Sequence, residues 1–282
     1  MPELPEVETV CRGLRPVLDQ AVIQDVVIRQ CKLRIPIPTD FRKRLVSRRI
    51  INVRRRAKYI LIELSDGGVI IGHLGMSGRM TIYRLGDVIP SPARHDHFDL
   101  VIKGGTTIRY SDPRRFGLIT HTFKQLLSEH VLLRKLGPDP LCDEFNGEVL
   151  AARLKGRKTS IKSALLDQKI LAGLGNIYIC ESLFRSHISP KRKAENVQGI
   201  RASKLVRAVK QVLSEAIDAG GSSLRDHMQP DGTLGYFQHN FQVYGREGKP
   251  CPNCNCNVDS TGGIKRIIQG DRSTFYCSRK QR

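Results

Sequence analysis

The chain has 282 residues and 40% of them are apolar, so it is long enough to bury a core in each of two domains. Lys and Arg number 47 against 27 Asp and Glu, and this net charge of +20 predicts a nucleic-acid partner. An anionic membrane surface, or a basic surface that is merely solvated, is the alternative. No apolar stretch reaches the roughly 18 residues of a membrane span, and the first residues lack the pattern of a signal peptide. We therefore expect a cytoplasmic protein with no membrane partner.

The predicted elements begin with an amphipathic helix over residues 5–18. Its apolar side chains recur at spacings of three and four, and Pro5 lies near its first turn. The apolar positions are Val7, Val10, Cys11, Leu14, Val17 and Leu18. The helix should bury this stripe and leave the first residues of the chain accessible.

From about residue 20 to 125 the pattern changes to short β-rich runs separated by Gly, Asp, Ser and Pro, which predicts an antiparallel β-sandwich. The clearest runs are residues 22–29, 59–64, 68–74, 79–85 and 98–102. Helical periodicity follows as far as residue 220. Its main segments are residues 125–136, 145–154, 160–171, 176–184 and 202–217.

Residues 221–242 are polar and show little periodicity, and so long a loop in a compact protein usually has a function. We expect an α+β fold with three domains. They are an N-terminal helix with a β-sandwich over residues 1–125, a helical domain over residues 126–242, and a cysteine-rich tail over residues 243–282.

Pro2 is the first residue with candidate chemistry, because removal of the initiator Met would leave its secondary amine as the chain terminus. The pKa of an α-amino group is about 7.7–8.0, so roughly a tenth is an unprotonated nucleophile at neutral pH. Such an amine can attack a sugar C1′ and form a Schiff base. Glu3 and Glu6 would share a helix face beside it and could shuttle protons. The simpler explanations are that Met-Pro is a common start and that a helix dipole favours acidic residues in its first turn.

Lys58 lies where a basic run meets an apolar strand, so it could contact a phosphate or lower the pKa of the Pro2 amine by repulsion. A solvated strand end is the ordinary alternative. Two glycine-bounded segments, GHLGMSGRM and SDPRRFG, combine apolar with basic side chains. The first contains Met76, and the second contains Phe116 next to Arg114 and Arg115. Such side chains can fill the space that a flipped base leaves, although a hairpin with a core Met or Phe is equally consistent with the pattern.

A candidate phosphate site lies in AGLGNIYICESLF, where Gly173 and Gly175 come directly before a predicted helix. Backbone N–H groups can approach an anion at such a helix start, and Asn176 adds a side-chain donor. Lys162 and Lys169 upstream favour the same interpretation.

The eight cysteines form two groups. Cys11, Cys31, Cys142 and Cys180 are scattered, as small core residues are. The others bunch near the C-terminus and indicate zinc in a reducing cytosol; they are Cys251, Cys254, Cys256 and Cys277.

The zinc site lacks an obvious fourth ligand, because position 280 is a lysine where a second Cys-x2-Cys would end. Either Cys256 supplies that ligand or the metal is weakly bound or absent. The segment YGREGKPCPNC predicts a strand, a turn and a metal-binding knuckle. Arg272 should lie on the following hairpin, where its guanidinium can clamp a phosphate or simply be solvated.

Taken together, these segments resemble the bacterial formamidopyrimidine-DNA glycosylase family. PELPEVET, GHLGMSGR, SDPRRFG, GLGNIY, DGTLGYFQHNFQVYGREGKPC and RSTFYC match its motifs in order across essentially the whole chain. The resemblance implies a β-sandwich with an N-terminal helix, a helical domain with a helix–two-turn–helix motif, and a zinc-finger-like β-hairpin. It also implies one structural zinc ion and damaged double-stranded DNA as the partner of a bacterial, nucleoid-associated enzyme. We expect a monomer, because the sequence shows no self-complementary apolar repeat.

The implied activity is excision of oxidised purines such as 8-oxoguanine, followed by β,δ-elimination, so the enzyme would be both a glycosylase and an abasic-site lyase. Pro2 would be the nucleophile, Glu3 the proton shuttle and Glu6 a supporting carboxylate, while Lys58 would contact phosphate beside the lesion. The loop around residues 221–237 would close over the oxidised purine.

The resemblance also implies a set of DNA contacts. Asn176 and Arg272 would clamp phosphates, and Arg114 would pair with the orphaned cytosine. The full set is His73, Met76, Arg114, Phe116, Lys169, Asn176 and Arg272.

Two departures from the family pattern concern the tail. Lys280 replaces the fourth cysteine, and 22 residues separate Cys254 from Cys277, more than in the usual hairpin. Three alternatives remain: a sister enzyme of the endonuclease VIII type that removes oxidised pyrimidines, an inert DNA-binding module, and a metal-dependent nuclease. The separated Met76 and Arg114/Phe116 segments favour the purine enzyme, the intact PELPE argues against an inert module, and the lack of a dense Asp/Glu/His cluster argues against the nuclease.

Overall fold

The computed structural model describes residues 2–223, 229–252, 254 and 257–282. They form two compact units. The first runs to Arg134 and also includes Ala219–Tyr236, and the second consists of Lys135–Asp218 and Phe237–Arg282. Residues 219–236 thus pack with the first unit, whereas the sequence pattern places them at the end of the helical region.

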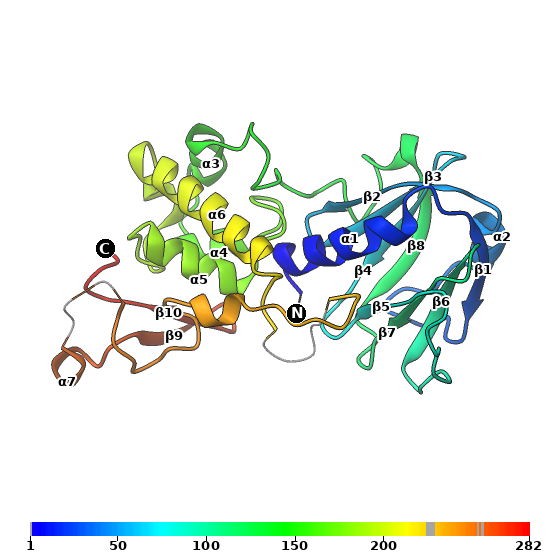
Figure 1. Cartoon of the computed structure of the whole chain (residues 1–282). Coiled ribbons are helices and arrows are strands. Elements are labelled where there is room, and N and C mark those ends of the chain that lie inside the picture. The colour runs from blue at the N-terminus through cyan, green and yellow to red at the C-terminus, as the bar shows by residue number, and fades with distance from the viewer. Residues whose placement is uncertain (1, 224–228, 253, 255–256) are drawn as a thin grey trace. The chain divides into compact units, whose positions relative to one another are not determined.

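The first unit begins with helix α1, Leu4–Leu18, close to the predicted 5–18 (Figure 1). The stripe expected from the spacing is buried against the sandwich, except that Val17 is only partly buried. Glu3 is the N-cap, and Glu3 and Glu6 form a reciprocal capping box that satisfies backbone N–H groups at the helix start. The cap therefore fixes both carboxylates at the N-terminus.

Two four-stranded antiparallel sheets form the predicted β-sandwich. One has the strand order β1-β6-β7-β5 and the other β2-β3-β4-β8. The first comprises β1 (Ile23–Ile28), β6 (Asp96–Ile102), β7 (Thr107–Ser111) and β5 (Arg79–Tyr83). The second comprises β2 (Ile50–Arg56), β3 (Tyr59–Leu64), β4 (Gly68–His73) and β8 (Leu118–Phe123). Inward-facing aliphatic and aromatic side chains of both sheets share one core with α1 and the short helix α2, Phe41–Leu45.

The second unit is helical and carries a β-hairpin. Its helices are α3 (Gly147–Leu154), α4 (Ile161–Leu166), α5 (Asn176–Arg185), α6 (Ile200–Asp218) and α7 (Val258–Thr261). The hairpin consists of β9 (Lys265–Gln269) and β10 (Arg272–Tyr276), and β10 packs against α5. The fold class predicted from the sequence is confirmed.

Two local predictions are wrong. Residues 125–136 form turns after a 3-10 helix at Lys124–Leu126, because Leu126 is 49% and Val131 69% exposed and so offer no buried stripe to hold a helix. The predicted strand at Tyr244 is also absent. The N–H groups of Gln242, Val243 and Tyr244 instead donate to the buried carboxylate of Glu181 at 2.9, 3.0 and 2.9 Å.

No helix in the described part of the chain is both long and apolar enough to cross a membrane.

Candidate functional site

The first candidate site lies at the N-terminus, where Pro2 directly precedes the cap of α1. Glu3 and Glu6 are only 4% and 2% exposed, and the backbone N–H of Glu3 donates to Glu6 Oε2 at 2.8 Å. Burying two carboxylates is unfavourable unless they are hydrogen-bonded, so these acids are held in place rather than solvated. The i, i+3 spacing brings the Glu6 carboxylate to the Glu3 backbone at the start of the helix.

Gly221 and Ser222, which follow the helical region, lie against Glu6. The backbone N–H of Ser222 donates to Glu6 Oε1 at 2.8 Å. Gly221 has φ +81°, and a Cβ there would lie 3.2 Å from Glu6 Cγ, so glycine suits this position on both counts. Part of the loop expected to close over a purine, residues 224–228, lies outside the described residues.

Lys58 and His73 are neighbours at one end of the sandwich. Lys58 occupies the two-residue turn between β2 and β3 and is only 7% exposed, so it is not a solvated strand end. Tyr59 pairs with His73 across β3 and β4, and their ring centroids are 4.9 Å apart. The N–H of Gly75 donates to His73 Nδ1 at 2.9 Å, so that nitrogen is occupied by a hydrogen bond within the protein.

Burial, followed by the charges of Arg34 and Lys58, lowers the pKa of His73 from 6.5 to about 4. Unfolded His73 therefore binds a proton between these pH values while native His73 remains neutral. We expect its contribution to the free energy of unfolding to be complete above pH 6.5 and to fall toward pH 4, by at most about 1.4 kcal/mol per pH unit.

Urea unfolding between these pH values tests this. The free energy of unfolding of His73→Gln should depend less on pH than that of wild type. The exposed control His239→Gln should show the wild-type pH dependence. Equal pH dependence in wild type and His73→Gln would contradict the prediction.

Met76, Arg114 and Phe116 are exposed on two loops that meet. Met76 is 40% and Phe116 47% exposed, so neither is the core residue of an ordinary hairpin. The Arg114 guanidinium lies 4.8 Å from the Phe116 ring centroid. The loops that carry them, Leu74–Gly78 and Asp112–Gly117, are joined by the hydrogen bond from Arg114 N to Ser77 Oγ at 3.1 Å.

In the second unit, three predicted anion-binding residues gather at the tip of the β9–β10 hairpin. Buried Lys162 donates from Nζ to Gln269 O at 3.2 Å, and Asn176 Nδ2 donates to Ser273 O at 2.8 Å. Between these two acceptors, Arg272 is exposed at the start of β10. Burial lowers the pKa of Lys162. Lys169 is exposed on the turn after α4, where its N–H donates to Asp167.

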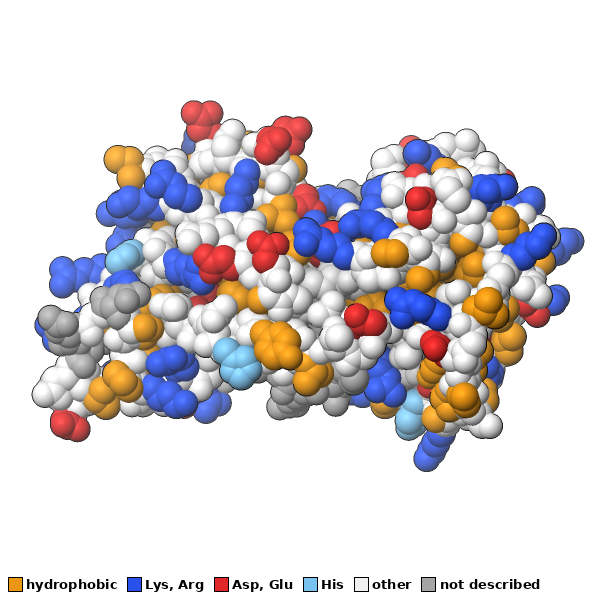
Figure 2. Space-filling view, in the orientation of Figure 1, with side chains coloured by type: hydrophobic (Ala, Val, Ile, Leu, Met, Phe, Trp, Pro, Cys, Tyr) orange, Lys and Arg blue, Asp and Glu red, His pale blue; other side chains and the backbone are white. Residues whose placement is uncertain are grey.

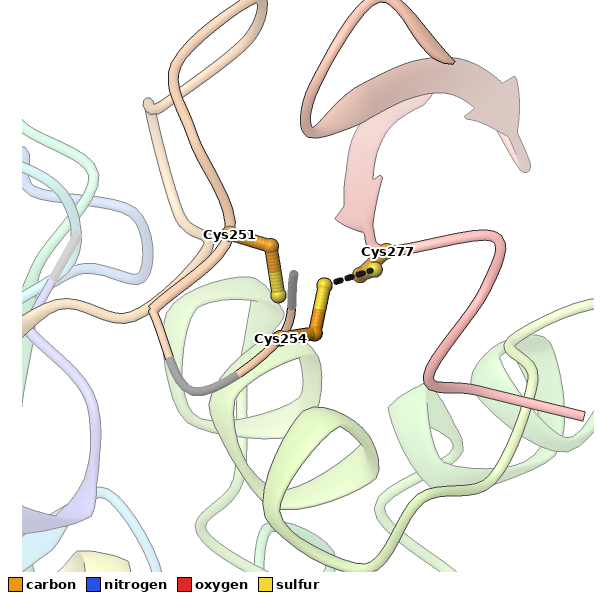
Figure 3. Close-up of side chains that lie close together, drawn as sticks. All are labelled: Cys251, Cys254 and Cys277. Carbon is orange, nitrogen blue, oxygen red and sulfur yellow. Dashed lines mark hydrogen bonds between the residues drawn. The ribbon is translucent and has the colours of Figure 1, made fainter. Parts of the chain in front are cut away.

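The predicted metal site is partly assembled (Figure 3). The sulfur atoms of Cys251, Cys254 and Cys277 all lie within 4.8 Å of one another, and those of Cys254 and Cys277 are 3.7 Å apart. Zn–S bonds of about 2.3 Å in a tetrahedron place sulfurs about 3.8 Å apart, and the Cys254–Cys277 pair has this spacing. Cys256 lies outside the described residues.

Lys280 lies beside this cluster and lines the same pocket as Cys254. Its ammonium lies 4.5 Å from the centroid of the Phe184 ring, while its backbone N–H donates to Cys277 Sγ at 3.4 Å. Gln281 accepts from Cys277 N at 2.8 Å and donates to Ile188 O at 2.9 Å, which anchors the chain end on the helical core.

Lys and Arg side chains are spread over both units on the face shown in Figure 2. Exposed basic residues also lie on α6, among them Arg201, Lys204 and Arg207. Such a surface suits a polyanion.

Sequence reasoning missed Asp112, Ser77 and Glu181. All three are buried polar residues that fix loops, Asp112 and Glu181 being 0% exposed. For Glu181 a signal was present, since a carboxylate on the apolar face of NIYICESLF must find hydrogen-bond donors.

Comparison with known proteins agrees with this arrangement. A family model described as the formamidopyrimidine-DNA glycosylase N-terminal domain matches residues 1–119, and one described as its H2TH domain matches residues 136–228. The formamidopyrimidine-DNA glycosylase of Rhodospirillum rubrum is 54% identical over 283 residues, covering 100% of both chains. That of Ruegeria pomeroyi is 51% identical over 287 residues, also covering 100% of both.

Solved structures give the same result. The MutM (Fpg) protein of Thermus thermophilus matches with a TM-score of 0.85 and 39% identity, covering 99% of this chain and 98% of that one. Wild-type Lactococcus lactis Fpg, solved with DNA containing N7-benzyl-Fapy-dG, matches with a TM-score of 0.87 and 30% identity over 99% of each chain. The chain therefore belongs to the formamidopyrimidine-DNA glycosylase family.

Proposed function

We propose that this protein excises oxidised purines from duplex DNA through a Schiff base on the Pro2 amine and then cleaves the strand. The observation that carries the proposal is the pair of buried, mutually capped carboxylates, Glu3 and Glu6, directly after the candidate nucleophile. A binding module needs no buried acid pair beside its terminus, whereas acid–base catalysis of sugar opening does.

The atoms of the reaction balance with these groups. Attack of the amine on C1′ breaks the bond to the base, which takes up the proton that the amine loses; iminium formation then opens the C1′–O4′ bond, so O4′ must take a second proton. Glu3 would supply it, and Glu6, which accepts from the Ser222 N–H, would hold Glu3 through the Glu3 backbone N–H. Loss of a C2′ proton expels the 3′ phosphate, a second elimination expels the 5′ phosphate, and hydrolysis returns the amine.

DNA binding follows from the remaining candidates. Lys58, Lys169, Asn176 and Arg272 would contact phosphates, which position the duplex without reading its sequence. Met76, Arg114 and Phe116 would enter the stack where the lesion is flipped out, with Arg114 facing the orphaned cytosine. The domain boundaries at residues 125 and 242 remain predictions, as does a monomeric state. A bacterial cytoplasmic, nucleoid-associated location is also a prediction, and the DNA substrate favours it.

Zinc would hold the tail beneath the hairpin that carries Arg272. Cys251, Cys254 and Cys277 would be three ligands, and Cys256 is the candidate for the fourth. The ion would be structural and take no part in catalysis.

We expect purified protein to contain about one zinc per chain. Cys277→Ser should lower that content, while Cys31→Ser, which changes an exposed thiol outside the cluster, should not. Elemental analysis of dialysed protein measures both. Wild-type protein without zinc would contradict the assignment.

Base release tests the activity. The protein should release 8-oxoguanine placed opposite cytosine and nick the strand, with activity retained in a chelator that would stop a metal-dependent nuclease. Preference for an oxidised pyrimidine would support the endonuclease VIII-type alternative, and binding without release would indicate an inert module.

A further inference from the structure

Asp112 is a buried carboxylate that the proposed chemistry does not use. It follows β7, its residue is 0% exposed, and three donors surround its two oxygens. Ser77 Oγ donates to Oδ1 at 2.6 Å, while Gly117 N and the Tyr110 hydroxyl donate to Oδ2 at 2.8 and 3.2 Å. Charge-assisted bonds of this kind are stronger and more directional than neutral ones. Asp112 therefore binds its own loop and the loop of Ser77 at the same time.

Ser77 completes the link. Its hydroxyl donates to Asp112 and accepts the N–H of Arg114 at 3.1 Å, so one side chain joins segments 35 residues apart in sequence. Met76 precedes Ser77 directly. The backbones that carry Met76 and Arg114 are thus held by the same hydroxyl.

The same two loops are also in close backbone contact. A Cβ on Gly75 would lie 2.4 Å from both Gly117 N and Phe116 C, and Gly75 has φ +63°. A Cβ on Gly117 would lie 1.8 Å from the Tyr110 hydroxyl. Only glycines allow this approach, which carries the backbone of Phe116 against the Met76 loop.

These contacts hold side chains that the fold itself leaves exposed. Met76 and Phe116 remain 40% and 47% exposed although neighbouring residues hydrogen-bond their two loops to each other, and Arg115 has the left-handed φ of +54°. An apolar pair kept rigid and exposed suits insertion into a partner, because little ordering is then needed on binding.

We propose that the Ser77–Asp112 pair couples the Met76 loop to the Arg114/Phe116 loop, so that the three side chains enter the duplex as one unit; this rests on the proposed function. Ser77 and Asp112 are positioning residues and touch no DNA. Opening a base stack is unfavourable, and two independently moving loops would each lose part of their binding free energy in becoming ordered.

A double-mutant cycle tests the coupling. Ser77→Ala should slow single-turnover release of 8-oxoguanine from duplex about tenfold, as expected for losing a hydrogen bond to a charged group. In a Phe116→Ala background the same change should slow release less than about twofold, because the loops no longer act together. Thermal unfolding of each variant verifies that it is folded at the assay temperature.

Ser111→Ala is the matched control, since Ser111 is a buried serine that donates to Asp96 within the same sheet and does not join the loops. It should leave the rate of release within about twofold of wild type. If Ser77→Ala does not fold, Ser77→Cys, which keeps only a weak donor, takes its place in the cycle.

Equal effects of Ser77→Ala with and without Phe116 would overturn the coupling, as would an effect of Ser111→Ala as large as that of Ser77→Ala. Failure of the proposed function looks different. In that case wild type itself would release no purine and form no borohydride-trapped complex with abasic DNA.

Discussion

Replacing Pro2 with glycine should reduce borohydride-trapped protein–DNA complex by about 100-fold or more. The variant keeps a terminal amine, but a primary amine gives a neutral imine where proline gives a permanently charged iminium. Glycine also lacks the ring that orients the nitrogen ahead of the α1 cap. Single-turnover trapping on 8-oxoguanine duplex, quantified on a denaturing gel, measures the loss.

Pro92→Gly is the matched control, because Pro92 lies exposed in the loop before β6. Its trapping rate should equal that of wild type, and Pro2→Gly should still bind the duplex in a mobility-shift assay. Trapping by Pro2→Gly at the wild-type rate would show that another amine is the nucleophile.

Glu3→Gln should slow release of the base by about 10²–10⁴-fold, the range for loss of a positioned general acid. Glutamine preserves the size of the side chain and its capacity to accept the cap hydrogen bond, so folding should change little. The rate of base release under single-turnover conditions and the thermal midpoint, recorded together, separate chemistry from stability.

Glu148→Gln provides the comparison, since Glu148 is an exposed acidic residue in the first turn of α3. It should retain full activity. A rate of base release by Glu3→Gln within about threefold of the wild-type rate would show that Glu3 is not the general acid.

Local pattern predicted those features that local physics determines. Helix α1 follows from the spacing of Val7 to Leu18, and the acid pair at its start follows from i, i+3 geometry. The position of Lys58 at a strand end was visible as a basic run that meets an apolar strand, although its burial was not. In each case the deciding contacts lie within a few residues of one another.

Long-range pairing was not predictable in this way. Strand β1 pairs with β6 some seventy residues away, and Ser77 meets Asp112 only because β5 and β7 are neighbours. The sequence pattern at Tyr244 is typical of a strand, but its backbone N–H donates to the Glu181 carboxylate on α5 instead of to a neighbouring strand. Residues 125–136 have helical spacing, but the tertiary fold leaves Leu126 and Val131 exposed while Leu133 is buried, so no continuous apolar stripe is covered. Helical periodicity identifies an apolar face but does not show whether the rest of the fold buries that face.

The most direct test of the account is to identify the atom that bonds to DNA. The wild-type complex trapped with borohydride on 8-oxoguanine duplex is digested with protease and nuclease, and the modified peptide is sequenced by mass spectrometry. We predict the sugar adduct on the N-terminal peptide, which begins at Pro2 after loss of Met1. An adduct on a lysine such as Lys58 or Lys162, or no adduct at all, would contradict the claim that the terminal proline is the nucleophile.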